Sequence, residues 1–350
     1  MRFGLPYLMI LLFCCIACSH DDVAIPNKIP VPASISVPGN FPQPVYDFTQ
    51  NPLTEEGIAL GKMLFYDPIL SRNNTISCGS CHLQPSAFTH HGHTVSHGID
   101  DLLGRRNSLP IQNLIWYTNF FWDGGVHQLD LVALDPISNP VEMDEDVQIV
   151  LEKLRGVQKY RDQFAAAFGS EEITSTQFLQ ALSQFVATMV SANSRYDHYI
   201  RNEGEQLTTE ELDGLAIFQE KCATCHATDL FTDQSFRNNG LSATVLTDRD
   251  GGRAEVTLRE EDRGKFKVPS LRNVEYTGPY MHNGKFQTLE SVLEFYATGV
   301  QISATLDPTL VNDDGTVGVP LTAEEKKKII AFLRTLSDEQ FLSDRRFSEY

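Results

Sequence analysis

Apolar residues recur at helical spacing in several segments of the chain, and polar residues that favour a helix N-terminus precede them. Each of the clearest segments begins with a threonine followed by acidic residues, which is typical of a helix start. In the second and third segments a Glu stands three residues after the Thr and completes a capping-box pattern. The pattern predicts helices at 54–67, 208–222 and 322–336.

A further helix is predicted between Thr288, a good N-cap residue, and Gly299, which favours a helix end. Residues 145–200 add two or three more helices, whereas strand patterns are sparse throughout. The chain is therefore predicted to be mainly α. Helical spacing places four residues on one apolar face of the 288–299 segment: Leu289, Val292, Leu293 and Tyr296.

One sequence of features occurs twice along the chain: a Gly, a Phe four residues later, and then a Cys-x-x-Cys-His motif. The copies are Gly61, Phe65 and Cys78 to His82, and Gly214, Phe218 and Cys222 to His226. A repeat at this scale is too long for a solenoid and indicates two similar lobes in tandem. We expect an N-terminal domain at 51–200 and a C-terminal domain at 201–340.

The first 18 residues fit an export signal, with one Arg and then an apolar run of roughly a dozen residues, too short for a permanent membrane span. The end of this segment resembles a bacterial lipoprotein cleavage box with Cys18 as the lipidated residue, although Cys15 stands where such boxes usually carry Leu. An ordinary cleaved signal is the alternative. Residues 19–50 are rich in Pro and Val and are expected to form an extended arm.

The two Cys-x-x-Cys-His motifs carry the clearest chemistry. Their two thiols can add to the vinyl groups of one haem while the neighbouring His reaches the iron. A thioredoxin-like site would need a βαβ context, and a four-cysteine zinc site pairs its halves within roughly 20 residues. The sequence therefore predicts two haem c groups, held by Cys78, Cys81, His82, Cys222, Cys225 and His226.

Composition adds two limits. With 350 residues, 41% of them hydrophobic, the chain can bury a sizeable core. Its formal charge of −18 argues against nucleic acid as a partner, because a phosphate backbone attracts clustered Lys and Arg. The cysteines beyond the signal all belong to the haem motifs, so no structural disulfide is expected.

Over roughly residues 50–340, the chain resembles the bacterial di-haem cytochrome c peroxidase family, including its methylamine-utilisation maturation (MauG-like) branch. Beside the haem motifs, the resemblance rests on short segments: Gly104-Arg-Arg-Asn107-Ser108, Phe121-Trp122-Asp123-Gly124, Pro140-Val-Glu142-Met143, Pro269-Ser-Leu-Arg-Asn273 and Thr277-Gly-Pro279-Tyr280-Met281-His282-Asn-Gly284. It implies two cytochrome c-like domains with different tasks.

The resemblance implies that the haem on His82 reacts with peroxide and the haem on His226 collects electrons. Trp122 corresponds to an electron relay between them, although a buried Trp is more often a core residue. Glu142 corresponds to the acid–base residue, because a carboxylate over the iron can move a proton from the near to the leaving oxygen of peroxide. A Ca²⁺ ion between the haems is implied as well, with Asn107, Thr277 and Pro279 as oxygen ligands.

The sequence departs from the family pattern near the first haem. His90, His91, His93 and His97 crowd the region of a distal ligand. His97 fits best as a switchable sixth ligand of the iron, and an exposed loop of titrating imidazoles is the alternative. Val132 stands where a Gln is often found, which removes a hydrogen bond from the pocket.

The sixth ligand of the second iron is predicted to be Tyr296, with Met281 as the competing candidate. The family position, counted from Pro279, falls on Tyr296, where peroxidases carry Met and the maturation branch carries Tyr. A thioether raises the potential of the iron, whereas a phenolate favours its ferric form. His282 is interpreted as a structural residue near a propionate.

The leading hypothesis is an exported peroxidase that reduces hydrogen peroxide to water. Its electrons would come from a small cytochrome or a cupredoxin and pass through the C-terminal to the N-terminal haem. One alternative is a maturation-type oxidase acting on a partner protein, and another is an electron carrier without peroxide chemistry. The expected location is the periplasm, with Cys18 as a lipid anchor. The sequence leaves the oligomeric state open, a homodimer included.

Overall fold

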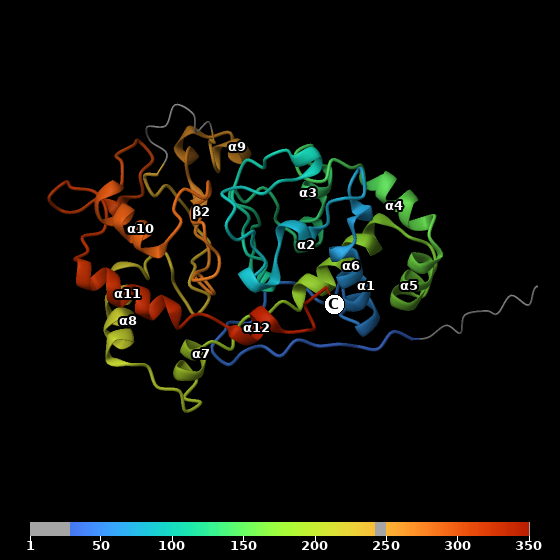
Figure 1. The fold of residues 1–350 in the computed structure, drawn as a ribbon, viewed down its shortest axis with the longest axis horizontal. Helices are drawn as coiled ribbons and strands as arrows, with labels where there is room; N and C mark the ends of the chain where they lie inside the picture. Colours follow the sequence, from blue (N-terminus) through green and yellow to red (C-terminus); the bar gives the residue numbers. More distant parts are fainter. Residues whose placement is uncertain (1–28, 242–249, 350) are drawn as a thin grey trace, which may run out of the picture.

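Two helical lobes lie side by side in the computed structural model, which describes residues 29–241 and 250–349 (Figure 1). The first lobe contains α1 (Glu55–Tyr66), α2 (Cys78–Cys81), α3 (Leu134–Ser138), α4 (Val147–Arg155), α5 (Gln158–Phe168) and α6 (Ser175–Ala187). After α7 (Arg195–Ile200), the second lobe contains α8 (Thr209–Lys221), α9 (Ala254–Thr257), α10 (Leu289–Glu294) and α11 (Ala323–Arg334). The last helix, α12 (Glu339–Ser343), returns to the first lobe. The predicted mainly α architecture is confirmed.

Strand structure is slight in the described part of the chain. The two-residue strands β1 (Phe236–Arg237) and β2 (Phe266–Lys267) pair antiparallel, with Phe236 opposite Lys267. Short 3-10 turns supplement the helices at 68–70, 84–86, 99–101, 114–116, 129–131, 260–262 and 308–310, and a π-helical turn follows α10 at Phe295–Gly299.

The predicted helix starts are confirmed by their caps. The Thr54 hydroxyl accepts a hydrogen bond from the Gly57 amide, and Thr208 and Thr322 each form a capping box with the Glu three residues on. The expectation of two or three helices within 145–200 was too low, because α4 and α5 are separated by a turn at Gly156. This fully described range holds four helices, α4 to α7.

The repeated glycines explain the architecture shared by the lobes. A Cβ atom at Gly61 would lie 1.9 Å from the Ala181 carbonyl oxygen of α6, and one at Gly214 would lie 2.0 Å from the Lys328 carbonyl oxygen of α11. Only glycine lets the helix backbones approach this closely. Each haem motif is therefore preceded by a helix that packs tightly on a second helix of its own lobe.

The described part of the N-terminal arm, 29–50, is extended and runs along both lobes (Figure 1). The Ala33 amide bonds to the Leu53 carbonyl at 2.9 Å, and the Trp116 indole nitrogen donates to the Pro42 carbonyl at 2.7 Å. The predicted signal at 1–18, with Cys18, lies outside the described residues.

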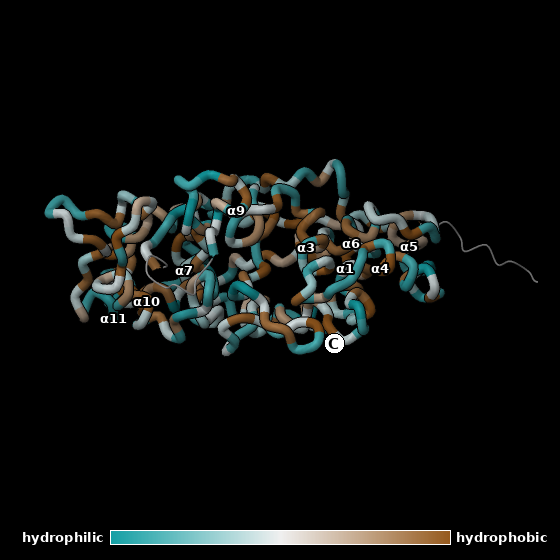
Figure 2. The backbone as a smooth tube through the Cα atoms, turned by 90° about the horizontal axis from the view of Figure 1, so that it is seen from above, coloured by the Kyte–Doolittle hydropathy of each residue, from teal (hydrophilic) through white to brown (hydrophobic). Residues whose placement is uncertain are grey.

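Hydrophobic stretches of the backbone run through α1, α4, α5 and α6 (Figure 2), whose buried residues form the core of the first lobe. Residues of α8 and α11 contribute to a separate core in the second lobe. Within the described ranges, no helix combines the length and apolar character needed to cross a bilayer.

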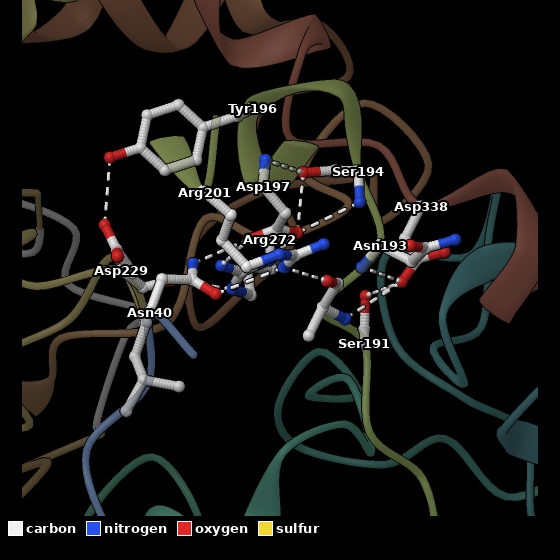
Figure 3. A network of polar contacts seen from close by, with 12 residues as sticks. Asn40, Ser191, Asn193, Ser194, Tyr196, Asp197, Arg201, Asp229, Arg272 and Asp338 are labelled. Carbon is white, nitrogen blue, oxygen red and sulfur yellow. Dashed lines mark hydrogen bonds and ion pairs between the residues drawn. The ribbon is translucent and has the colours of Figure 1, made fainter. Parts of the chain in front are cut away.

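A buried polar network joins the lobes (Figure 3). The Arg272 guanidinium makes two hydrogen bonds of 2.8 Å with the Asp197 carboxylate, and both side chains are fully buried. Asn40 of the arm donates to the same carboxylate at 2.9 Å. Nearby, the Asp338 carboxylate accepts backbone N–H bonds from Ala192 and Asn193. Since a broken buried ion pair is costly, this network fixes how the lobes sit together.

Candidate haem sites

A cavity of about 490 Å³ lies in the first lobe and reaches the interface with the second. Cys78, Cys81 and His82 line one part of its wall, and Glu142 and Trp122 line other parts. Most of the exposed wall is apolar, as suits a cofactor pocket with a few placed polar groups. Val132, which stands where the family often carries a Gln, also lines the cavity.

The orientation of His82 is set by a backbone carbonyl. Its Nδ1 atom lies 2.6 Å from the Phe88 carbonyl oxygen, and burial lowers the pKa of His82, which keeps the imidazole neutral. With the proton on Nδ1, the Nε2 lone pair is available to a metal. This arrangement fits the proximal ligand of a haem iron.

The second lobe repeats this arrangement around a cavity of about 580 Å³ lined by Cys222, Cys225 and His226. His226 Nδ1 lies 3.0 Å from the Phe231 carbonyl oxygen, and burial lowers its pKa. Our sequence reasoning missed these orienting carbonyls. A signal was available, because a Phe-Thr pair follows each Cys-x-x-Cys-His motif, at Phe88 and at Phe231.

Both candidate sixth ligands of the second iron line the second cavity together with His226. The Met281 sulfur and the Tyr296 hydroxyl oxygen each lie 3.4 Å from the Asn239 amide nitrogen. Tyr296 stands in the π-helical turn after α10, a local widening often found at functional sites. Burial raises the pKa of Tyr296 to about 12. The structure thus brings the two candidates together, and the choice of Tyr296 stays a prediction.

Trp122 stands where the two cavities meet and lines both. Its indole nitrogen donates to the Asn107 carbonyl at 2.8 Å, and its own carbonyl accepts from the Lys267 amide of β2 at 2.7 Å. The His282 ring stacks on Phe266 with centroids 3.7 Å apart and meets the Trp122 ring edge-on at 6.4 Å. The predicted relay residue is therefore held by segments of both lobes.

Glu142 combines access to the first cavity with a perturbed acidity. Burial, and then the Asp135 carboxylate, raise the pKa of Glu142, while an Asn139 hydrogen bond of 2.8 Å lowers it. Its backbone is held by the loop that follows the histidine cluster: the Ile99 amide bonds to the Glu142 carbonyl at 2.7 Å. A Cβ atom at Gly98 would lie 2.2 Å from the Val141 carbonyl oxygen, so the loop packs directly on this segment.

His97 does not line the first cavity in this structure. Its side chain is 41% exposed, and its Nδ1 atom lies 2.7 Å from the Asp101 carboxylate. His90 and His93 stack with centroids 4.1 Å apart, and His93 meets His97 edge-on at 5.5 Å. The described arrangement corresponds to the alternative of an exposed imidazole loop.

The predicted calcium ligands Asn107, Thr277 and Pro279 all line the second cavity. The Asn107 side-chain nitrogen donates to the His93 and Thr94 carbonyls. No group of three or more His, Cys, Asp or Glu side chains able to hold a metal ion occurs among the described residues. Calcium binding through neutral oxygens remains a prediction.

The two cavities define a protein with two c-type haems, because each presents two cysteines and an oriented histidine to one pocket. Comparisons with known proteins agree. A model of the di-haem cytochrome c peroxidase family matches residues 55–205. The chain is 37% identical to the methylamine utilization protein MauG of Methylorubrum extorquens over 83% of this chain and 80% of that protein.

The cytochrome c551 peroxidase of Nitrosomonas europaea is 34% identical over 80% of each chain. Among solved structures, a MauG-like protein associated with microbial copper homeostasis has 34% identity and a TM-score of 0.83, covering 91% of this chain and 99% of that one. The chain belongs to the di-haem cytochrome c peroxidase family. It is a haem-dependent oxidoreductase with two haem c groups.

Proposed function

We propose that this protein reduces hydrogen peroxide to water in the first lobe, using electrons that enter through the second. When bound, the haems supply the iron for peroxide chemistry at His82 and an electron store at His226. The observation that carries the proposal is that Glu142 lines the same cavity as His82, while Trp122 lines that cavity and the next.

The protein groups divide the remaining work. Glu142 in its carboxylate form accepts a proton from the near oxygen of peroxide and returns it to the leaving oxygen. The raised pKa of this buried group suits it to both halves of the transfer. Trp122 provides a fixed aromatic ring between the two cavities, and the neutral His82 imidazole remains available to the metal.

Peroxide turnover with a reduced small cytochrome tests this function directly. Glu142→Gln should lower kcat roughly 10²-fold or more, the usual contribution of a positioned acid–base group. Glu152→Gln, on the exposed surface of α4, is the matched control and should leave kcat unchanged. Wild-type turnover by Glu142→Gln would contradict the acid–base role of Glu142. No turnover by the unaltered holoprotein would contradict the proposed function and leave the electron carrier.

A second candidate function is the oxidation of a partner protein, as in the maturation branch. It is favoured by Tyr296, whose hydroxyl lies in the second cavity and whose phenolate would stabilise oxidised iron. This function predicts that oxidising equivalents persist after stoichiometric peroxide without reductant. Their immediate loss would rule it out.

We also propose export to the periplasm with a lipid anchor on Cys18, supported by the apolar segment that precedes it. Fatty-acid labelling of wild type but not of Cys18→Ala tests the anchor; equal labelling would refute it. Because the chain carries a formal charge of −18, the electron donor is expected to present a basic face, so raised salt should slow its reaction.

A further inference from the structure

Lys267 of β2 is a buried cation at the meeting point of the two cavities. Its side chain lines both of them, and the residue is only 6% exposed. Its position is fixed by its backbone, which donates to the Trp122 carbonyl at 2.7 Å and pairs with Phe236 in the sheet. Its ammonium lies 4.5 Å from the centroid of the Tyr117 ring.

The other Lys and Arg residues that line the cavities all have carboxylate partners. Lining the first cavity, Arg105 pairs with Glu255 at 2.6 Å and Arg106 with Asp250 at 2.6 Å. In the second, Lys221 pairs with Glu325 at 2.6 Å and Arg237 with Asp233 at 2.7 Å. For Lys267, no carboxylate of the described residues lies within ion-pair distance.

A buried ammonium without a counter-ion is unfavourable. Without a counter-ion, burial lowers the pKa of Lys267 to about 7. Neither the aromatic ring of Tyr117 nor the apolar neighbours can supply a full negative charge. A carboxylate from the group that fills the cavities would stabilise the charged form of Lys267, and haem carries two propionate carboxylates.

We propose that the Lys267 ammonium is the counter-ion of a haem propionate where the two cavities meet. The inference rests on the two bound haems and not on peroxide chemistry. A positive charge held here favours the ferrous over the ferric state of a nearby iron, because reduction removes one positive charge from the iron. Since Lys267 lines both cavities, it raises the potentials of the two haems together.

Reductive titration of the holoprotein, followed by the visible spectrum of each haem, tests the charge effect. Lys267→Gln should raise the ferric-to-ferrous ratio of at least one haem about tenfold at a fixed potential, which corresponds to a fall of about 59 mV. Lys267→Arg should retain the wild-type midpoints. Lys265→Gln is the matched control, because Lys265 pairs with Asp262 at 3.2 Å and lines neither cavity.

Infrared difference spectra of haem labelled with ¹³C in its propionate carboxyls test the ion pair itself. In Lys267→Gln, a labelled carboxylate band should move or give way to a protonated carboxyl band at neutral pH, since the neighbouring cation is lost. Wild-type midpoints together with unchanged labelled bands would overturn the proposal. If Lys267→Gln fails to retain haem, Lys267→Met, which also removes the charge, decides: a moved or protonated labelled band supports the ion pair, and a wild-type band refutes it. Neither readout depends on peroxide turnover.

Discussion

The Trp122 indole N–H donates to the Asn107 backbone carbonyl at 2.8 Å, and this bond holds the ring in the wall shared by the two cavities. The Asn107 amide in turn bonds to the His282 carbonyl at 2.8 Å. Trp122, the predicted relay residue, is thus tied to the segment that also contributes Met281 to the second cavity. A substitution at Trp122 should therefore change electron transfer between the two haems more than it changes either haem site by itself.

Trp122→Phe should slow electron transfer between the haems roughly tenfold or more. The smaller ring leaves the Asn107 carbonyl without its donor and opens a gap in a packed wall. Stopped-flow reoxidation of the fully reduced protein by peroxide would measure the step. Trp116→Phe is the control, since Trp116 is buried and hydrogen-bonded but lines neither cavity; equal rates in the two variants would count against a relay.

The pH profile of peroxide turnover should depend on Asn139. If Glu142 is the group that accepts the peroxide proton, its carboxyl group must be ionised, so turnover should fall as the pH drops through its pKa. Asn139→Ala removes the 2.8 Å hydrogen bond that favours the charged form, which raises the pKa of Glu142 further. The acidic limb should therefore move to higher pH. Asn119→Ala is the control, because Asn119 lies outside the first cavity, and it should leave the acidic limb of the pH profile unchanged. An unchanged acidic limb in Asn139→Ala would contradict the proposed role of Glu142.

Substitution of each candidate sixth ligand of the second iron should show whether Tyr296 or Met281 binds it. If Tyr296 binds, Tyr296→Phe should change the low-temperature spin-resonance signal of that haem, and Met281→Leu should leave it unchanged. The unaltered protein should then show no methionine-to-iron charge-transfer band. The reverse pattern would assign the ligand to Met281, because both groups lie 3.4 Å from the Asn239 nitrogen and either can reach the same region.

Substitution of Asp197 should weaken the buried polar network that joins the lobes and lower the free energy of unfolding. Asp197→Asn leaves the buried Arg272 guanidinium without its counter-charge, which should cost about 3–5 kcal/mol in the free energy of unfolding. Denaturant titration followed by circular dichroism measures this loss. Glu205→Gln breaks a pair with Arg195 in which the Arg side chain is 47% exposed, and it should change stability little. A loss no larger than that of Glu205→Gln would contradict the structural role.

The lowered pKa of Asp197 also predicts how the free energy of unfolding changes with pH. Burial alone would raise the pKa of Asp197, but the hydrogen bonds and charge of Arg272 lower it to about 2. Because an unfolded Asp titrates near 3.9, its stabilising contribution is complete above about pH 4 and is lost as the pH falls towards 2. Asp197→Asn should flatten this part of the stability profile.

Features encoded locally were predictable from the sequence. The capped helices at Thr54, Thr208 and Thr322 and the haem motifs depend on near neighbours in the chain, and the structure reproduces them. The lack of a carboxylate partner for Lys267 among the described residues was not predictable from the sequence. It depends on tertiary packing, which places this residue of β2 in the walls of both cavities. His97 shows the same limit. A loop pattern does not say whether an imidazole faces a pocket, and in the structure His97 contacts the exposed Asp101 carboxylate.

Helix α12 and the residues after it have a consequence for biogenesis. Phe341 and Phe347 are buried in the core of the first lobe, and the Gln84 amide donates to the Phe341 carbonyl at 3.0 Å, close to the first haem motif. The lobe that begins near residue 51 therefore lacks part of its interior until residues 341–347 have been synthesised and have packed onto it. Haem attachment to the first motif therefore takes place either on an incomplete lobe, before these residues pack, or after they have completed its core.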